Sequence, residues 1–293
     1  MAPRTISRMS GHPGEEIDRY LRTGEYDELS SEWPGDTLLE RAKLGHDGLR
    51  RALIAEVRKR TEHVADREAL LGRDLVALTR AKVGPMVRGL FPRAEQGIVL
   101  GVLGHSVIFL TSSNIDEVLR ETRWHGTAWT LANLYLSSTG AVPLSEDAPR
   151  IVGLSEETTC FVSTEYFQEN GRFEDFIVHE AAHIFHNCKR RTIGLRETRR
   201  REWLLELEFA KRETFAYACE AYSRVLEQSH GIADRRRLLD ELGQDTLPAS
   251  DAVNAGEILD ILREAVTARN GWKRILAWCS PRRPTRRRRF GTA

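Results

Sequence analysis

The chain has 293 residues, of which 41% are hydrophobic, so it can form one large domain or two modest ones with a sizeable core. Its 44 basic and 43 acidic side chains nearly balance, which argues against a protein built mainly to coat nucleic acid. The four cysteines form no Cys-x-x-Cys pair, so a zinc ribbon or thioredoxin-type site is not indicated, and they fit a reducing compartment without disulfides.

No segment has the pattern of a signal peptide or a membrane span. Residues 1–20 are polar and charged. The most apolar stretch, Ile98 to Leu110, is too short to cross a bilayer and is interrupted by Gly101 and Gly104. We therefore expect a cytoplasmic protein with no membrane partner.

The N-terminal part of the chain is predicted to be helical. Apolar residues recur at helical spacing over Thr37 to His63, with Asp36 as the expected N-cap. Arg67 to Val83 continues in the same style. Gly84-Pro85 and Phe91-Pro92 are expected to end this region.

The middle of the chain contains short segments rich in β-branched and aromatic residues, which favour strands. We expect four of them: Ile98–Leu103, Val107–Leu110, Trp129–Leu136 and Thr158–Thr164. Ser113-Asn114, followed by acids, is expected to begin a helix.

The C-terminal half is again predicted to be helical. Two helices, over Phe173 to Asn187 and Glu202 to Gln228, are expected to be joined by a charged connection. Three shorter helices are expected over 234–242, 255–268 and 272–278. The last thirteen residues carry six arginines and should be disordered, as a flexible solubilising terminus rather than a nucleic-acid contact.

One segment, residues 177–186, contains the motif His-Glu-x-x-His within an apolar stretch. Residues four apart share one face of a helix, so His179 and His183 can offer two imidazole nitrogens to one metal ion. Glu180 would flank the metal without ligating it, where a general base can take a proton from a metal-activated water. The alternative is two unrelated surface histidines. The apolar flanks argue against it, because buried histidines need polar partners.

On these residues the chain resembles the zincin metallopeptidases, over roughly residues 96–228. The resemblance implies an α+β fold with a zincin-like core: a small twisted mixed sheet, an active-site helix and a following ligand helix, flanked by helical N- and C-terminal regions. It also implies one zinc ion and a peptide or protein substrate aligned by an edge strand. Thr158–Thr164 is placed suitably for that strand.

Four regions follow from this reading of the chain. We expect a helical N-terminal region at 1–95, the metal-binding catalytic core at 96–228, a helical C-terminal region at 229–280 and a disordered tail at 281–293.

The third metal ligand is open among four glutamates. A histidine six residues after the second motif histidine is excluded, because Lys189 stands there. The resemblance to the gluzincin group implies a glutamate from a following helix, and the candidates are Glu202, Glu206, Glu213 and Glu220. We favour Glu213, which lies among small and apolar residues, because a cation stabilises a carboxylate buried there. Its alternative partner is an arginine on its own helix.

Several neighbouring residues are candidates for supporting roles. Glu220, Glu174 and Asp175 could each hold a ligating histidine by a hydrogen bond. Tyr217 and His186 could stabilise a developing oxyanion, although packing or capping is favoured for both.

The sequence thus predicts a zinc-dependent hydrolase in which Glu180 passes a proton from the attacking water to the leaving group. Cleavage of peptide bonds is implied by the resemblance, not by the spacing. The alternative is a regulatory protein that uses a zincin scaffold without turnover, with its basic tail contacting nucleic acid. Glu180 favours the enzyme, because binding a metal does not require it.

Overall fold

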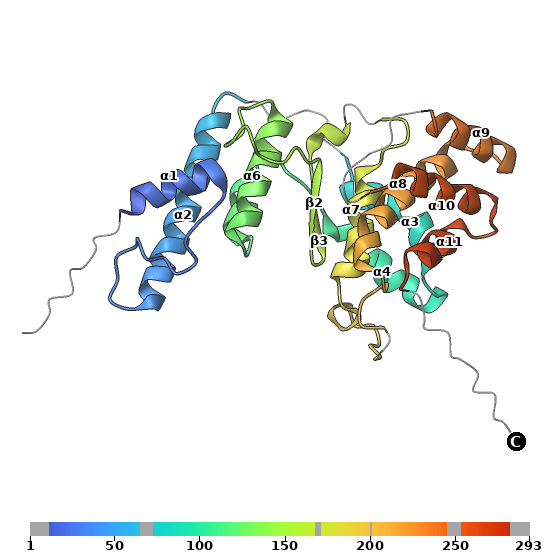
Figure 1. Cartoon of the computed structure of the whole chain (residues 1–293), viewed down its shortest axis with the longest axis horizontal. Coiled ribbons are helices and arrows are strands. Elements are labelled where there is room, and N and C mark those ends of the chain that lie inside the picture. Colours follow the sequence, from blue (N-terminus) through green and yellow to red (C-terminus); the bar gives the residue numbers. More distant parts are fainter. Residues whose placement is uncertain (1–11, 65–72, 168–170, 200, 245–252, 282–293) are drawn as a thin grey trace, which may run out of the picture. The chain divides into compact units, whose positions relative to one another are not determined.

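The computed structural model describes residues 12–64, 73–167, 171–199, 201–244 and 253–281 (Figure 1). Within them the fold is α+β and mostly helical, with eleven α-helices and one small sheet, so the α+β part of the predicted fold class is confirmed. No described helix is both long and apolar enough to span a bilayer. All four cysteines are buried and unpaired. Apart from Pro281, the predicted disordered tail lies outside the described residues.

Contacts within the chain divide it into two compact units, and each unit is assembled from separate stretches of sequence. Neither unit coincides with one predicted region, and the boundaries after 95, 228 and 280 stay predictions. Unit 1 comprises Met1–Leu71, Phe109–Leu154 and Ser163–Gln168, and unit 2 comprises Gly72–Ile108, Ser155–Val162 and Glu169–Ala293.

Unit 1 is helical: α1 (Pro13–Thr23), α2 (Leu38–Thr61), α5 (Ile115–Glu121) and α6 (His125–Thr139). Helix α2 packs against α1, α5 and α6. It begins with a capping box between Thr37 and Glu40, so Thr37 is the N-cap rather than Asp36. Arg50, buried on α2, donates hydrogen bonds to the carbonyl oxygens of Leu119 and Thr122. These bonds satisfy acceptors that the end of α5 leaves unpaired.

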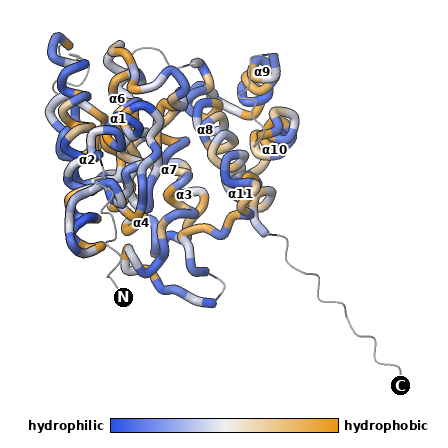
Figure 2. Tube along the Cα trace, turned by 60° about the vertical axis from the view of Figure 1, so that its left-hand side comes forward, coloured by the Kyte–Doolittle hydropathy of each residue, from blue (hydrophilic) through white to orange (hydrophobic). Residues whose placement is uncertain are grey.

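Unit 2 contains the remaining helices: α3 (Leu75–Leu90), α4 (Arg93–Ser106), α7 (Phe176–Asn187), α8 (Arg212–Gln228), α9 (Ile232–Leu242), α10 (Ala255–Thr267) and α11 (Gly271–Cys279). Helix α10 buries residues three and four apart, from Ile258 to Val266, and its alternating hydropathy is visible in Figure 2. The predicted break at Gly84-Pro85 is wrong, because α3 continues to Leu90. Val83, Met86 and Val87 are fully buried there, and this packing outweighs the hydrogen bond that Pro85 removes.

Two predicted strands are wrong, since both segments are helical. Ile98–Leu103 lies in α4, where packing against α3 overrides the strand preference of its β-branched residues. Trp129–Leu136 lies in α6, and almost all of it is buried. A helix buried on all sides has no polar face, so its sequence shows no helical period.

The sheet has three short strands, β1 (Val107–Phe109), β2 (Gly153–Glu156) and β3 (Thr159–Val162), in the order β1-β3-β2. The turn at Glu157-Thr158 joins β2 to β3 and makes this pair an antiparallel hairpin. Glu157 has a φ of 49°, in the left-handed region that such tight turns require. The strand predicted at Thr158–Thr164 corresponds to β3, which lies between β1 and β2 in the sheet. The prediction that it forms the edge is wrong. The edge beside it is β2, which its polar sequence did not reveal.

Candidate metal centre

Helix α7, which carries the two motif histidines, is held in place by a buried apolar face. Its apolar residues, from Ile177 to Phe185, are fully buried, and the helix packs against α3, α8 and β3. Asp175 caps its N-terminus by accepting a hydrogen bond from the Val178 amide, and Lys82 of α3 lies 3.0 Å from the Asp175 carboxylate. His179 and His183, one turn apart, retain a small exposed fraction.

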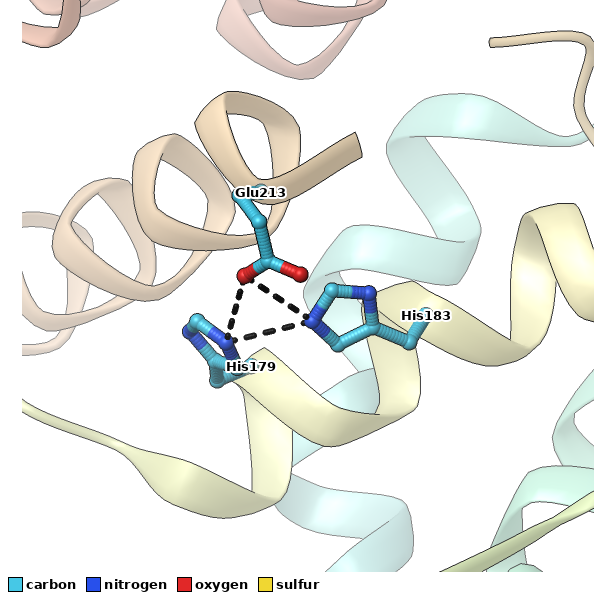
Figure 3. Close-up of side chains that lie close together, drawn as sticks. All are labelled: His179, His183 and Glu213. Atoms are coloured by element: carbon cyan, nitrogen blue, oxygen red, sulfur yellow. Dashed lines mark hydrogen bonds and ion pairs between the residues drawn. The ribbon is translucent and has the colours of Figure 1, made fainter. Parts of the chain in front are cut away.

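Three side chains from α7 and α8 converge on one point (Figure 3). The Nε2 atoms of His179 and His183 are 3.2 Å apart, and Glu213 Oε2 lies 3.8 and 3.5 Å from them, respectively. Ligand atoms around a tetrahedral zinc ion, each about 2.0–2.1 Å from the metal, are about 3.3 Å from one another. The group could therefore hold a metal ion, and it consists of the three ligands expected from the sequence.

Glu213 reaches this point because α8 begins at Arg212, which puts the glutamate in the first helical turn. Small residues without exposed surface, Ala181 on α7 and Ala216 on α8, are compatible with close packing of the two helices. The Glu213–imidazole distances exceed those of charge-assisted hydrogen bonds, about 2.7–2.9 Å. The three groups are therefore spaced as ligands of an ion between them would be.

Carboxylates give the site a preference for positive charge. Burial alone lowers the pKa of His179, but its interactions with Glu213 and Glu220 outweigh burial and raise that pKa to about 10. The two imidazoles in turn hold the pKa of the Glu213 carboxyl well below its ordinary value. The carboxylates that favour a protonated imidazole would also favour a bound cation.

Each histidine has a partner at Nδ1, the nitrogen that faces away from the metal position. His179 Nδ1 lies 3.0 Å from Glu220 Oε2, and the other Glu220 oxygen accepts a hydrogen bond of 2.7 Å from the Asp175 amide. His183 Nδ1 lies 3.0 Å from Nε2 of His186. Burial and the charges of His183 and Arg212 lower the pKa of His186 to about 4, so this third imidazole is neutral at pH 7.

Glu180 is buried on α7 beside the sheet. The Ser155 hydroxyl, on the edge strand β2, lies 2.6 Å from Glu180 Oε2 and 2.9 Å from the Glu180 carbonyl oxygen. Glu180 follows His179 directly on α7 and its charge contributes to the raised pKa of His179, but its carboxylate does not belong to the group of three converging side chains. Ser155 was not identified from the sequence, because no local pattern links it to a residue 25 positions away.

Two of the other glutamates considered as ligands, Glu202 and Glu206, lie elsewhere, and Glu220 contacts His179 at Nδ1 rather than at Nε2. The helix expected from Glu202 starts only at Arg212, because the intervening segment returns to α7: the Leu204 and Leu205 amides donate to the carbonyl oxygens of Cys188 and Phe185. Glu202 is partly exposed and pairs with Lys189 at 2.6 Å. Glu206 accepts hydrogen bonds from the Glu202 and Trp203 amides.

Among the expected supporting residues, Glu220 contacts His179 directly, and Asp175 donates a hydrogen bond from its backbone amide to Glu220. Glu174 instead accepts a hydrogen bond from the Gly171 amide. Tyr217 packs its ring edge-on against His179, with 4.5 Å between ring centroids.

In comparisons with known proteins, no family model, no curated protein and no solved structure matches this chain.

Proposed function

We propose that this protein is a zinc-dependent hydrolase and that its substrates are peptides or proteins. The observation that carries the proposal is the convergence of two imidazoles and one carboxylate within 3.2–3.8 Å, with a buried glutamate, Glu180, next to His179 in the chain. Two histidines and a glutamate form a ligand set of catalytic zinc, and three protein ligands leave a fourth position for water or substrate. We also propose that the core has a zincin-like arrangement and that the protein is cytoplasmic.

A zinc ion held there would supply a water of lowered pKa and would polarise a carbonyl group. The rest of the chemistry belongs to the chain. Glu180 receives the proton and returns it to the leaving amine, as a general base and then a general acid. The Ser155 hydroxyl holds Glu180 Oε2, and Glu220 keeps the His179 proton on Nδ1, so that Nε2 is free to bind the metal.

The test begins with metal analysis of protein purified without added metal. Stoichiometric zinc is expected. Iron in its place would contradict the proposal, because two histidines and a carboxylate also form the iron site of oxygenases.

The second part of the test separates catalysis from metal binding. A quenched-fluorescence peptide library should be cleaved by the wild type, and Glu180→Gln should lower the rate roughly 10²–10⁴-fold while keeping its zinc. Zinc binding with no cleavage of any peptide by the wild type would instead support the non-catalytic scaffold. The nucleic-acid contact proposed for that alternative depends on the arginine-rich tail, which the described residues do not include beyond Pro281.

A further inference from the structure

A third imidazole lies behind the metal site, on the side of His183 that faces away from Glu213. His186 is 6% exposed, one turn beyond His183 on α7, and the two rings are nearly perpendicular at 86°. The contact joins His183 Nδ1 to His186 Nε2 at 3.0 Å. His186 Nδ1 is buried and makes no hydrogen bond of normal geometry to a described residue, although the neighbouring Asn187 side chain acts on the ring. Through Nε2 the ring contacts His183.

The direction of this hydrogen bond follows from the metal site. His183 Nε2 points at Glu213 and at Nε2 of His179, so it is the nitrogen that a metal would take. A neutral imidazole that gives the lone pair of Nε2 to a metal carries its proton on Nδ1. His183 must then donate, and His186 must accept through Nε2 and hold its own proton on Nδ1.

We propose that His186 is a positioning residue of the metal centre: it accepts the Nδ1 proton of His183 and so fixes the tautomer and ring orientation in which His183 binds the metal. This inference rests on the proposed metal site but not on its hydrolytic activity. It also assigns His186 a role different from oxyanion stabilisation, since the Nε2 atom is committed to His183.

The two ligating histidines are consequently held by acceptors of different kinds. His179 donates to a carboxylate, and Glu220 is itself fixed by the Asp175 amide. His183 donates to a neutral ring, and hydrogen bonds between neutral groups are weaker than those to a charged acceptor. His183 is therefore the less firmly held of the two, and its orientation depends on the one ring behind it.

Two substitutions separate this role from simple packing. His186→Phe keeps a ring of similar size but removes the acceptor, whereas His186→Gln supplies an amide oxygen that can accept the same proton. His105→Phe, at an exposed position of unit 2, serves as the control for exchanging a histidine.

The measurement is zinc affinity, obtained by competition with a chelator, together with thermal unfolding of the zinc-free proteins. His186→Phe should bind zinc roughly 10–100-fold more weakly, the usual effect of losing the partner of a ligating histidine, while its zinc-free form unfolds no earlier than the wild type. His186→Gln should retain most of the affinity. Wild-type affinity in His186→Phe, or equal losses in both variants, would overturn the proposal.

A spectroscopic measurement on the wild type keeps the proposal open to refutation even if His186→Phe does not fold. In the zinc-loaded protein, nitrogen-15 NMR should show His183 protonated at Nδ1 and His186 unprotonated at Nε2. Metal binding through Nδ1 of His183 would refute the inference. Zinc binding with these tautomers but without peptide cleavage would refute the proposed hydrolase and leave the role of His186 standing.

Discussion

Two histidine clusters, one in each unit, show how strongly neighbouring charges decide what a buried imidazole does. His125 of unit 1 is 6% exposed and contacts the rings of Tyr20, Tyr26 and His46. Burial and the charges of Arg50 and His46 lower its pKa to about 4. Both His125 and His179 are substantially buried, so burial does not explain why their pKa values move in opposite directions.

The difference lies in the carboxylates. Glu213 and Glu220 raise the pKa of His179 to about 10 in spite of burial, whereas burial, Arg50 and His46 all lower the pKa of His125. The charges around His179 favour a bound cation, whereas those around His125 disfavour one. We therefore expect the acidic partners of a histidine cluster, rather than its number of imidazoles, to decide whether it binds a metal.

The most severe test of this contrast removes a ligand. His183→Ala should weaken zinc binding on the order of a hundredfold or more, because the free energy of a zinc site, about 10–16 kcal/mol, is shared among few ligands. Glu213→Ala should act in the same way, and His46→Ala should leave zinc content unchanged. Retention of stoichiometric zinc by Glu213→Ala would move the third ligand elsewhere.

A smaller effect is expected when only the supporting carboxylate is neutralised. Glu220→Gln should weaken zinc binding roughly 10–100-fold, because the amide is a poorer acceptor for the Nδ1 proton of His179. In the metal-free protein the pKa of His179 should also fall, which a proton NMR titration can follow. An unchanged pKa would show that Glu220 does not control the charge of this ring.

The His125 cluster predicts a pH dependence of stability. The pKa of His125 is about 4 in the folded protein and about 6.5 when the chain is unfolded, so the unfolded state binds the proton more readily. The contribution of the neutral His125 ring to the free energy of unfolding is complete above about pH 6.5. It is lost as the pH falls towards 4, by up to about 1.4 kcal/mol per pH unit. Urea unfolding should show a steeper loss of stability with falling pH in the wild type than in His125→Phe. Parallel pH profiles would contradict it.

The smallest effect is expected from giving the His125 cluster a carboxylate, as the His179 cluster has. His46 is exposed on α2, with its ring centroid 4.7 Å from that of His125. His46→Glu should raise the pKa of His125 by about one unit, because an opposite charge within about 4–6 Å favours the protonated ring. His46→Gln is the control, and equal titration curves for the two variants would show that solvent screens this position.

The parts of the molecule that the sequence predicted are those with local signals. The placement of His179 and His183 on one face follows from helical spacing alone. Glu213 was favoured among four glutamates because of the small residues around it, and it lies in the same group as the two histidines. The contact of His183 with His186 is also local, since residues three apart are neighbours on a helix. Its importance became visible only when the ring nitrogens could be placed.

The errors come from segments where tertiary packing decides. Trp129–Leu136 has the composition of a strand, yet it forms a buried helix because α2 and α5 cover it. The Ser155–Glu180 contact joins a strand to a helix, and a polar four-residue strand gives no periodic signal to predict it from.

The division of each unit into separate stretches of sequence has a practical consequence for making shorter proteins. A fragment that begins at residue 72 would keep every residue of the metal centre, yet it would strip α1 and α2 from α5 and α6. The apolar side chains between Leu131 and Leu136 would then meet water, and such surfaces cause aggregation. A workable minimal version must also excise most of residues 109–154 and bridge the gap with a short polar loop.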